Sequence, residues 1–319
     1  MVDGRASAQV HINCHMPNQN YKDHIEVVLP YECLLGEGPV WDADNKIISW
    51  IDVLNGIKHE FDTKRATHRM IELGVILGSI ALTNSGNYLA ALKSGLAIVD
   101  RITGNKSFLH HPESSISTNR FNDGKCDRAG RFWVGTMSML EEPGAGNVYM
   151  FDEKLTCTKK IESVTISNGL VWSADHKTLY YIDTPTLQVV AYDYDISTGK
   201  ISNKQVVVNI PQNEGYPDGM TIDKEGMLWI AHWDGSQVAR WDPSSGKKIH
   251  FINLPVDRVT SCTFGGEHLT DIYITTAKVG LTEKQLSEQP LAGSLFIIRD
   301  SEFQGLPSTK FDDTRVIIP

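Results

Sequence analysis

The sequence lacks the features that would place the protein in a membrane, on a nucleic acid or in a disulfide-rich fold. No uninterrupted apolar run approaches the roughly 20 residues that span a bilayer. Only five cysteines occur among 319 residues, widely spaced and without a CxxC pair, which excludes a zinc knuckle or a disulfide framework. The formal net charge is -9, and no basic stripe offers a surface for phosphate backbones or anionic lipids. We therefore expect no nucleic acid and no membrane partner, but a neutral or cationic small ligand.

The first residues also lack the apolar stretch of a secretion signal. Residues 1–23 are polar, and we expect them to form a loose N-terminal extension. The predicted location is therefore cytoplasmic, with the cysteines reduced. A bond between Cys14 and Cys33 stays open for an exported protein. Residues 24–319 are predicted to form a single domain.

One short pattern recurs along the chain: a small or polar corner, an apolar strand, a turn rich in Asp, Asn and Gly, and a second strand rich in aromatic residues. Six copies begin at Gly36, Leu77, Phe121, Ser167, Pro217 and Val259. The residues just ahead of the first turns, 41 to 50 positions apart, are Trp41, Leu82, Cys126, Trp172, Ile222 and Phe264. This period is typical of the four-stranded blades of a β-propeller.

The two ends of the repeat array predict how the ring closes. The sixth repeat has no fourth strand of its own, whereas the strand-like segment 24–30 precedes the first repeat without a partner. Pairing them would cover exposed sheet edges. The predicted fold is all-β, a six-bladed β-propeller of four-stranded antiparallel blades whose ring is closed by an N-terminal strand. Helix signals are weak except at residues 281–289. A closed ring favours a monomer, and a dimer stays open.

Equivalent polar positions on the innermost strands should converge, because each of these strands begins near the central axis. Four residues ahead of the six anchors stand Glu37, Gly78, Asn122, Asn168, Asp218 and Thr260. A single polar residue at such a place usually caps a turn. Two carboxylates facing one pocket repel, however, and a hard divalent cation with oxygen ligands relieves that repulsion. We therefore predict one divalent metal: Ca²⁺, Mg²⁺ or Mn²⁺ suits all-oxygen ligands, and Zn²⁺ stays open.

The motifs GEGPVWD, NRFNDGKCDRAGRFWVGTM, SNGLVWSADHKTLYYIDT and YPDGMTIDKEGMLWIAHWDG resemble, in order, the signatures of the SMP-30/gluconolactonase/luciferin-regenerating-enzyme family. The family includes sugar lactonases and regucalcin-like proteins. The resemblance implies one divalent metal held by Glu37, Asn168 and Asp218, three positions that the blade geometry also selects. It further implies that Arg120 and Asn122 bind the substrate.

The sequence departs from the family pattern after GTM, where a family glutamate contacts the sugar. Here the chain continues GTMSMLEEPGAG, which places Leu140 at that position, followed by Glu141 and Glu142. We predict that Glu141 is the substitute substrate contact after a shift of the loop. The alternative is that the contact is lost, which leaves the substrate preference open.

The resemblance implies a hydrolase that opens a sugar lactone to an aldonic acid, as gluconolactonase does. The metal would polarise the lactone carbonyl, and Asp218 is the candidate catalytic general base. Arg120 and Asn122 would orient the sugar hydroxyls, although Arg120 could instead form a structural ion pair. Two other functions stay open: a promiscuous organophosphate (phosphotriester) hydrolase on the same metal site, and a non-catalytic calcium-binding or interaction propeller.

Overall fold

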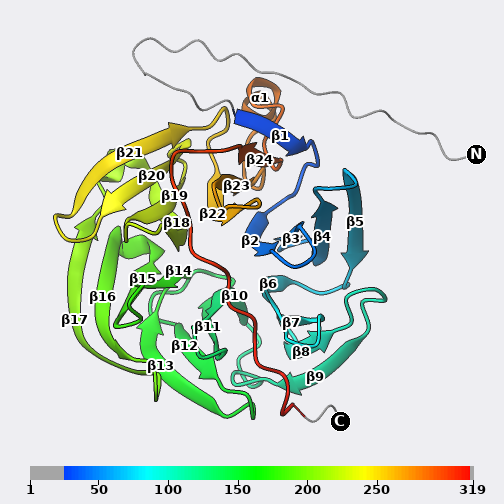
Figure 1. Ribbon diagram of the computed structural model, residues 1–319, viewed down its shortest axis with the longest axis vertical. Coiled ribbons are helices and arrows are strands. Elements are labelled where there is room, and N and C mark those ends of the chain that lie inside the picture. The colour runs from blue at the N-terminus through cyan, green and yellow to red at the C-terminus, as the bar shows by residue number, and fades with distance from the viewer. Residues whose placement is uncertain (1–24, 317–319) are drawn as a thin grey trace, which may run out of the picture.

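The computed structural model describes residues 25–316, which form six four-stranded antiparallel sheets set as blades around a central axis (Figure 1). Blade 1 consists of β2 (Gly36–Asp42), β3 (Ile47–Asp52), β4 (Ile57–Asp62) and β5 (Thr67–Glu72). Blade 2 consists of β6 (Leu77–Leu82), β7 (Tyr88–Leu92), β8 (Gly95–Val99) and β9 (Lys106–His110). Blade 3 consists of β10 (Asn119–Cys126), β11 (Phe132–Ser138), β12 (Gly146–Phe151) and β13 (Cys157–Val164). Blade 4 consists of β14 (Ser167–Trp172), β15 (Thr178–Asp183), β16 (Gln188–Asp195) and β17 (Lys200–Asn209). Blade 5 consists of β18 (Tyr216–Ile222), β19 (Leu228–Trp233), β20 (Gln237–Asp242) and β21 (Lys247–Asn253). The predicted six-bladed propeller is confirmed. The predicted extension over residues 1–23 lies outside the described residues.

Blade 6 joins the two ends of the described chain. It consists of β22 (Val259–Gly265), β23 (Asp271–Thr276), β24 (Leu295–Ile298) and β1 (Ile25–Leu29). β1 pairs antiparallel with β24, with Ile25 opposite Ile298 and Val27 opposite Phe296. The predicted closing strand is confirmed, and it covers an edge of β24 that would otherwise be free to pair with another chain.

Aromatic side chains fill the spaces between neighbouring blades. Trp133 of blade 3 meets Trp172 of blade 4 edge to face, with ring centroids 5.7 Å apart. Trp41 of blade 1 stacks on Tyr273 of blade 6, also with centroids 5.7 Å apart. Contacts of this kind add to the burial of apolar surface. They hold each blade, and therefore each inner strand, at a set angle to the central axis.

Helical structure within residues 25–316 is limited to the short 3₁₀ segments η1 (Thr184–Thr186) and η2 (Gln212–Glu214) and the helix α1 (Glu283–Glu288). α1 lies in the segment where the sequence predicts a helical turn. It begins with a capping box, in which Thr282 and Gln285 each bond to the other's backbone. No helix in the described part of the chain has the length and apolar character to cross a membrane.

The described cysteines match the prediction of reduced packing residues. Cys33, Cys126, Cys157 and Cys262 are free thiols, and all except Cys157 are buried. Burial raises the pKa of the Cys33 thiol to about 12 and that of Cys262 to about 12, so the reactive thiolate is suppressed. Cys14, the other member of the alternative pair, lies outside the described residues.

The carboxyl-terminal segment crosses the face of the ring, as the red trace in Figure 1 shows. The backbone N–H of Gly305 donates to the Leu269 carbonyl of blade 6 at 2.8 Å, and that of Phe311 donates to the Leu82 carbonyl of blade 2 at 2.7 Å. The Phe311 side chain is fully buried. The segment therefore ties together blades 6 and 2, which are not neighbours in the ring.

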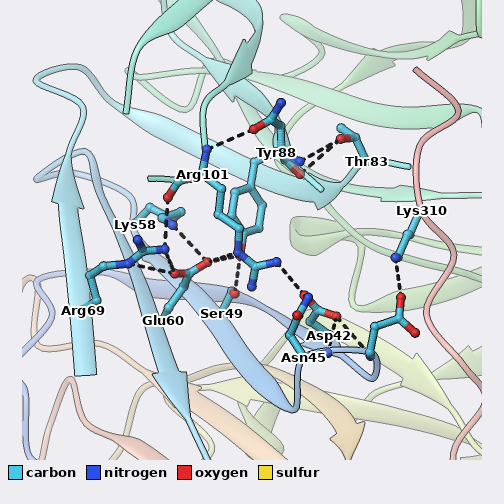
Figure 2. Close-up of polar contacts among 12 residues, drawn as sticks. Asp42, Asn45, Ser49, Lys58, Glu60, Arg69, Thr83, Tyr88, Arg101 and Lys310 are labelled. Carbon is cyan, nitrogen blue, oxygen red and sulfur yellow. Dashed lines mark hydrogen bonds and ion pairs between the residues drawn. The ribbon is translucent and has the colours of Figure 1, made fainter. Parts of the chain in front are cut away.

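A buried cluster of charges joins blades 1 and 2 (Figure 2). The Glu60 carboxylate on β4 accepts hydrogen bonds from Tyr88 Oη at 2.5 Å, from Arg101 Nε at 2.7 Å and from Arg69. Lys58 Nζ lies 3.2 Å from the same carboxylate, and its side chain is 1% exposed. Burial alone would raise the pKa of Glu60, but the charge on Lys58 and the bonds from Tyr88 and Arg69 hold it at about 2. The folded state therefore favours the ionised carboxylate.

This cluster predicts a pH-dependent contribution to stability. Because the pKa of Glu60 falls from its ordinary 4.5 to about 2 on folding, the stabilisation is present above pH 4.5 and is lost as the pH falls towards 2. Glu60→Gln should lower the free energy of unfolding at pH 7 by about 3–5 kcal/mol, because Lys58 stays buried without a counter-charge. The variant should also lose less stability than the wild type between pH 4.5 and 2.5. Urea unfolding at a series of pH values measures both effects.

Glu162→Gln is the matched control, because Glu162 is an exposed carboxylate that pairs only with Lys159 at 3.7 Å. We expect its pH profile to follow the wild type. Parallel profiles for all three proteins would contradict the role given to Glu60.

Candidate functional site

Each inner strand has an irregular register close to its start, where the regular pairing with the next strand is interrupted. These interruptions lie between Glu37 and Val40, Leu77 and Ser79, Phe121 and Gly124, Ser167 and Leu170, Pro217 and Met220, and Val259 and Ser261. A bulge of this kind bends a strand and changes the direction of its side chains. Because all six strands have it at the same level, the residues at the interruptions can face the axis.

Glycines follow three of the bulge residues and allow the strands to pack. Gly38, after Glu37, has a φ of +53°, a conformation that other residues rarely adopt. A Cβ atom at Gly219, after Asp218, would overlap the hydroxyl of Ser261 on the next inner strand. Replacing Gly219 would push β18 and β22 apart, whereas replacing Gly38 would strain the backbone beside Glu37.

The structure places Glu37, Asn168 and Asp218 at this common level, and their hydrogen bonds define which atoms remain available. Asn168 Nδ2 donates to Thr184 Oγ1 at 2.9 Å, so the amide oxygen is turned to the other side of the group. That oxygen accepts only a long bond of 3.3 Å from Asn122 Nδ2. One oxygen of Glu37 accepts the backbone N–H of Gly38 at 2.8 Å. A hydrogen bond also joins the carboxyl groups of Glu37 and Asp218. Oxygen-bearing groups from three blades therefore lie together at this level.

The surroundings of Glu37 and Asp218 disfavour the ionised form of both carboxyl groups. Burial raises the pKa of Asp218 well above its ordinary value, and the charges on Glu37 and Asp123 raise it further. Burial and the charge on Asp123 likewise raise the pKa of Glu37. The Asp218 side chain is 6% exposed, so water screens this repulsion poorly.

This donor set fits a hard divalent cation, because such ions prefer carboxylate and amide oxygens as ligands. The positive charge of the ion would also offset the repulsion between the carboxylates. Within residues 25–316, no group of three or more His, Cys, Asp and Glu side chains could hold a metal ion. A cation at the axis would therefore bind to the amide oxygen of Asn168 together with the carboxylates of Glu37 and Asp218. Soft metals that require thiolate or several imidazoles do not suit it.

Arg120 and Asn122 lie directly beside these three residues. Arg120 Nη1 donates to Asn122 Oδ1 at 2.6 Å and to the Phe121 carbonyl at 3.0 Å. Its guanidinium therefore contacts uncharged oxygens instead of the structural carboxylate partner that the sequence left open. Burial lowers the pKa of Arg120 to about 10, while the charges on Glu37 and Asp218 act in the opposite direction. Arg120 is thus a charged donor, only 9% exposed, at the site.

The two glutamates that follow Leu140, in the loop after β11, have different surroundings. Glu142 accepts a hydrogen bond from Ser138 Oγ at 2.9 Å. Glu141 is exposed, and its charge raises the pKa of the Arg120 guanidinium, against the larger effect of burial. Glu141 therefore lies within electrostatic range of the predicted substrate residue, and its role as a substrate contact stays a prediction.

Two of the six equivalent positions do not contribute to the polar site, which corrects the expectation that all of them line it. The Thr260 hydroxyl donates to the Gly36 carbonyl at 2.6 Å and is fully buried between blades 6 and 1. Gly78 has no side chain, and a Cβ atom there would overlap the Phe121 carbonyl. Both positions serve the packing of neighbouring inner strands.

Asp123 and Lys125 were not assigned a role from the sequence. Asp123 acts electrostatically on Glu37 and Asp218. Lys125 Nζ donates to the Met220 carbonyl at 2.8 Å, which links blade 3 to blade 5 across the axis. The sequence NDGK at residues 122–125 could have indicated both residues, because alternate side chains of a strand point to the same side and Asp123 and Lys125 are two positions apart.

A cavity of about 240 Å³ occupies the other end of the channel. All six inner strands line it with their later residues, and residues 306–309 of the carboxyl-terminal segment line it as well. Asp123 and Lys125 line this cavity, and Asp123 also acts electrostatically on the polar site.

Comparison with known proteins identifies the family of this chain. Residues 35–278 match the SMP-30/Gluconolactonase/LRE-like region. The chain belongs to this family. The resemblance of its motifs to this family is thereby confirmed.

Relatives in this family align along most of their length. The YvrE protein of Bacillus subtilis strain 168, which is provisionally named a sugar lactone lactonase, is 39% identical over 82% of this chain and 90% of its own. The regucalcin of Gallus gallus is 38% identical over 87% of this chain and 94% of its own. A solved structure of regucalcin from Agrobacterium tumefaciens strain C58, described as a calcium-binding protein, has a TM-score of 0.85 at 28% identity and covers 89% of this chain and 96% of that one.

The donor set of this family member predicts how a cation affects stability. Asp218→Asn removes one of the two repelling charges, so the variant should be more stable than the wild type at pH 8 in the presence of a chelator. A cation at about 100 times its Kd should stabilise the wild type by about 2.7 kcal/mol. The gain should largely disappear in Asp218→Asn. Thermal unfolding with Ca²⁺, Mg²⁺, Mn²⁺ or Zn²⁺ measures this difference.

Asp175→Asn serves as the control, because Asp175 is an exposed aspartate in the turn between β14 and β15. It should respond to cations as the wild type does. An equal gain in Asp218→Asn and the wild type would exclude Asp218 from the site.

Proposed function

We propose that this protein is a metal-dependent lactonase that opens sugar lactones to aldonic acids. The observation that carries the proposal is the convergence of Glu37, Asn168 and Asp218 beside the charged donor Arg120. The name of the Bacillus subtilis relative, which refers to sugar lactones, supports the same substrate class. Fold alone would not support it, since propellers serve many unrelated functions.

A bound cation supplies Lewis acidity towards the lactone carbonyl, and Glu37, Asn168 and Asp218 are the residues that would hold it. The protein's own groups position the substrate. Arg120 is fixed by its bonds to Asn122 and the Phe121 carbonyl, so its remaining N–H groups can donate to ring hydroxyls without losing further freedom. Asn122 is fixed in turn, because its Nδ2 donates to the Ser167 carbonyl at 2.8 Å.

Asp218 is the proposed catalytic base. Its carboxylate accepts a proton from the water that attacks the lactone carbonyl, and the ring carbon–oxygen bond then breaks. The same proton returns to the departing ring oxygen, so lactone and water yield one hydroxy acid. Burial keeps bulk water away from this carboxylate, which is only 6% exposed.

The proposed cofactor is one divalent cation, Ca²⁺, Mg²⁺, Mn²⁺ or Zn²⁺. The description of the Agrobacterium regucalcin as a calcium-binding protein supports Ca²⁺ in particular. It also supports the second candidate function, in which the protein binds calcium without turnover. Activity measurements separate the two.

The test is acid release from D-glucono-1,5-lactone at near-neutral pH, with the spontaneous rate subtracted. Chelation should abolish turnover, and restoring the ions one at a time should rank them. Asp218→Ala should lower kcat by about 10²- to 10⁴-fold. Its circular dichroism should match the wild type, because Asp218 lies outside the apolar contacts between blades. Asp175→Ala should retain full activity.

Metal binding without turnover of any lactone would favour the calcium-binding role. Full activity in Asp218→Ala would remove Asp218 from the reaction.

A further inference from the structure

The two loops beside Arg120 expose three apolar side chains, next to the exposed Glu141 and Glu142. Ile116, Met139 and Leu140 expose 41%, 40% and 69% of their surface. They come from two neighbouring loops, residues 111–118 before β10 and residues 139–145 after β11. Exposed apolar side chains that gather beside a binding site mark a surface for an apolar partner.

Strand pairing places these side chains at the mouth of the site. In the β10–β11 register, Asn119 lies opposite Ser138 and Arg120 lies opposite Met137. Met139 and Leu140 therefore continue β11 just beyond the level of Arg120. The backbone N–H of Met139 donates to the Thr118 carbonyl at 2.8 Å, which joins the two loops.

A buried carboxylate holds the first loop in place. Glu113 is 4% exposed and accepts four hydrogen bonds. The donors are Asn119 Nδ2 at 2.8 Å, Thr136 Oγ1 at 3.0 Å, Asn147 Nδ2 at 2.7 Å and Tyr149 Oη at 2.9 Å. Because these bonds anchor the start of the loop, Ile116 is presented to solvent by a preorganised backbone.

The second loop is fixed around Leu140. The backbone N–H of Leu140 donates to Ser138 Oγ at 3.1 Å, and Ser138 Oγ donates to the Glu142 carboxylate at 2.9 Å. Leu140 also stands where the family pattern has a glutamate that contacts the sugar. At this point of the rim the chain therefore offers an apolar surface in place of a hydrogen-bonding group.

From this arrangement we infer that the substrate is a lactone whose ring carries an apolar substituent, and that this substituent packs against Ile116, Met139 and Leu140. The inference rests on the proposed lactonase function and adds a preference for lactones that carry an apolar group. Arg120 and Asn122 would orient the polar ring while the rim removes the substituent from water. Each methylene of the substrate that is buried adds binding energy, whereas a substrate hydroxyl packed against an apolar surface adds little.

The test compares D-glucono-1,5-lactone with δ-lactones whose alkyl substituent grows from methyl to pentyl, at a saturating concentration of the most active cation. We expect kcat/KM to rise by about two- to fourfold with each added methylene. Leu140→Glu should flatten this rise and increase the relative rate with the gluconolactone. Ile102→Glu is the matched control, because Ile102 is 68% exposed in the turn between β8 and β9, at the other face of the ring. It should leave the chain-length dependence unchanged.

The δ-lactams with the same alkyl groups provide a binding measurement that does not depend on turnover. Their affinity, measured by calorimetry, should rise with chain length in the wild type and not in Leu140→Glu. Hydrolysis of gluconolactone with no dependence on the alkyl chain would overturn this inference and leave the proposed function standing. Lactam affinity that rises with chain length while no lactone is opened would support the apolar rim and reject the proposed function.

Discussion

The pairing of β1 with β24 is the constraint on which the rest of the structure depends. Without β1, blade 6 would have three strands and an exposed edge. Closure brings the starts of six inner strands to one axis. Residues such as Glu37 and Asp218, which are 181 positions apart in the numbering, become neighbours only for this reason. The carboxyl-terminal segment adds a second tie across the ring through the buried Phe311.

A stable ring can hold an unstable arrangement of charges at its centre. The raised pKa values of Glu37 and Asp218 show that the fold brings these carboxylates together at an electrostatic cost. The cluster around Glu60 is the opposite case, because Lys58 and Arg69 lower the pKa of that carboxylate. The protein itself neutralises the charge on Glu60, whereas we propose that a bound cation neutralises those on Glu37 and Asp218. This contrast distinguishes a site from a structural ion cluster.

The blades and the axial positions could be predicted because they follow from a period and from strand geometry. The bulges could not be predicted, since no residue pattern specifies a register shift. The glycines that follow Glu37, Asn168 and Asp218 are the only hint of them that these motifs contain. Thr260 was wrongly expected to line the site, because the sequence does not show that its hydroxyl bonds to the Gly36 carbonyl. The Glu60 cluster was also missed, since Glu60 on blade 1 meets Tyr88 and Arg101 only when blade 2 packs against blade 1.

The central claim is that Glu37, Asn168 and Asp218 together hold one divalent cation on the axis. Anomalous diffraction from crystals grown with Mn²⁺ tests it most directly, because the scattering locates the ion without any assumption about activity. The account predicts one strong peak coordinated by oxygens of these three side chains, and no such peak in crystals of Asp218→Ala. A peak elsewhere in the channel, or an unchanged peak in the variant, would contradict it.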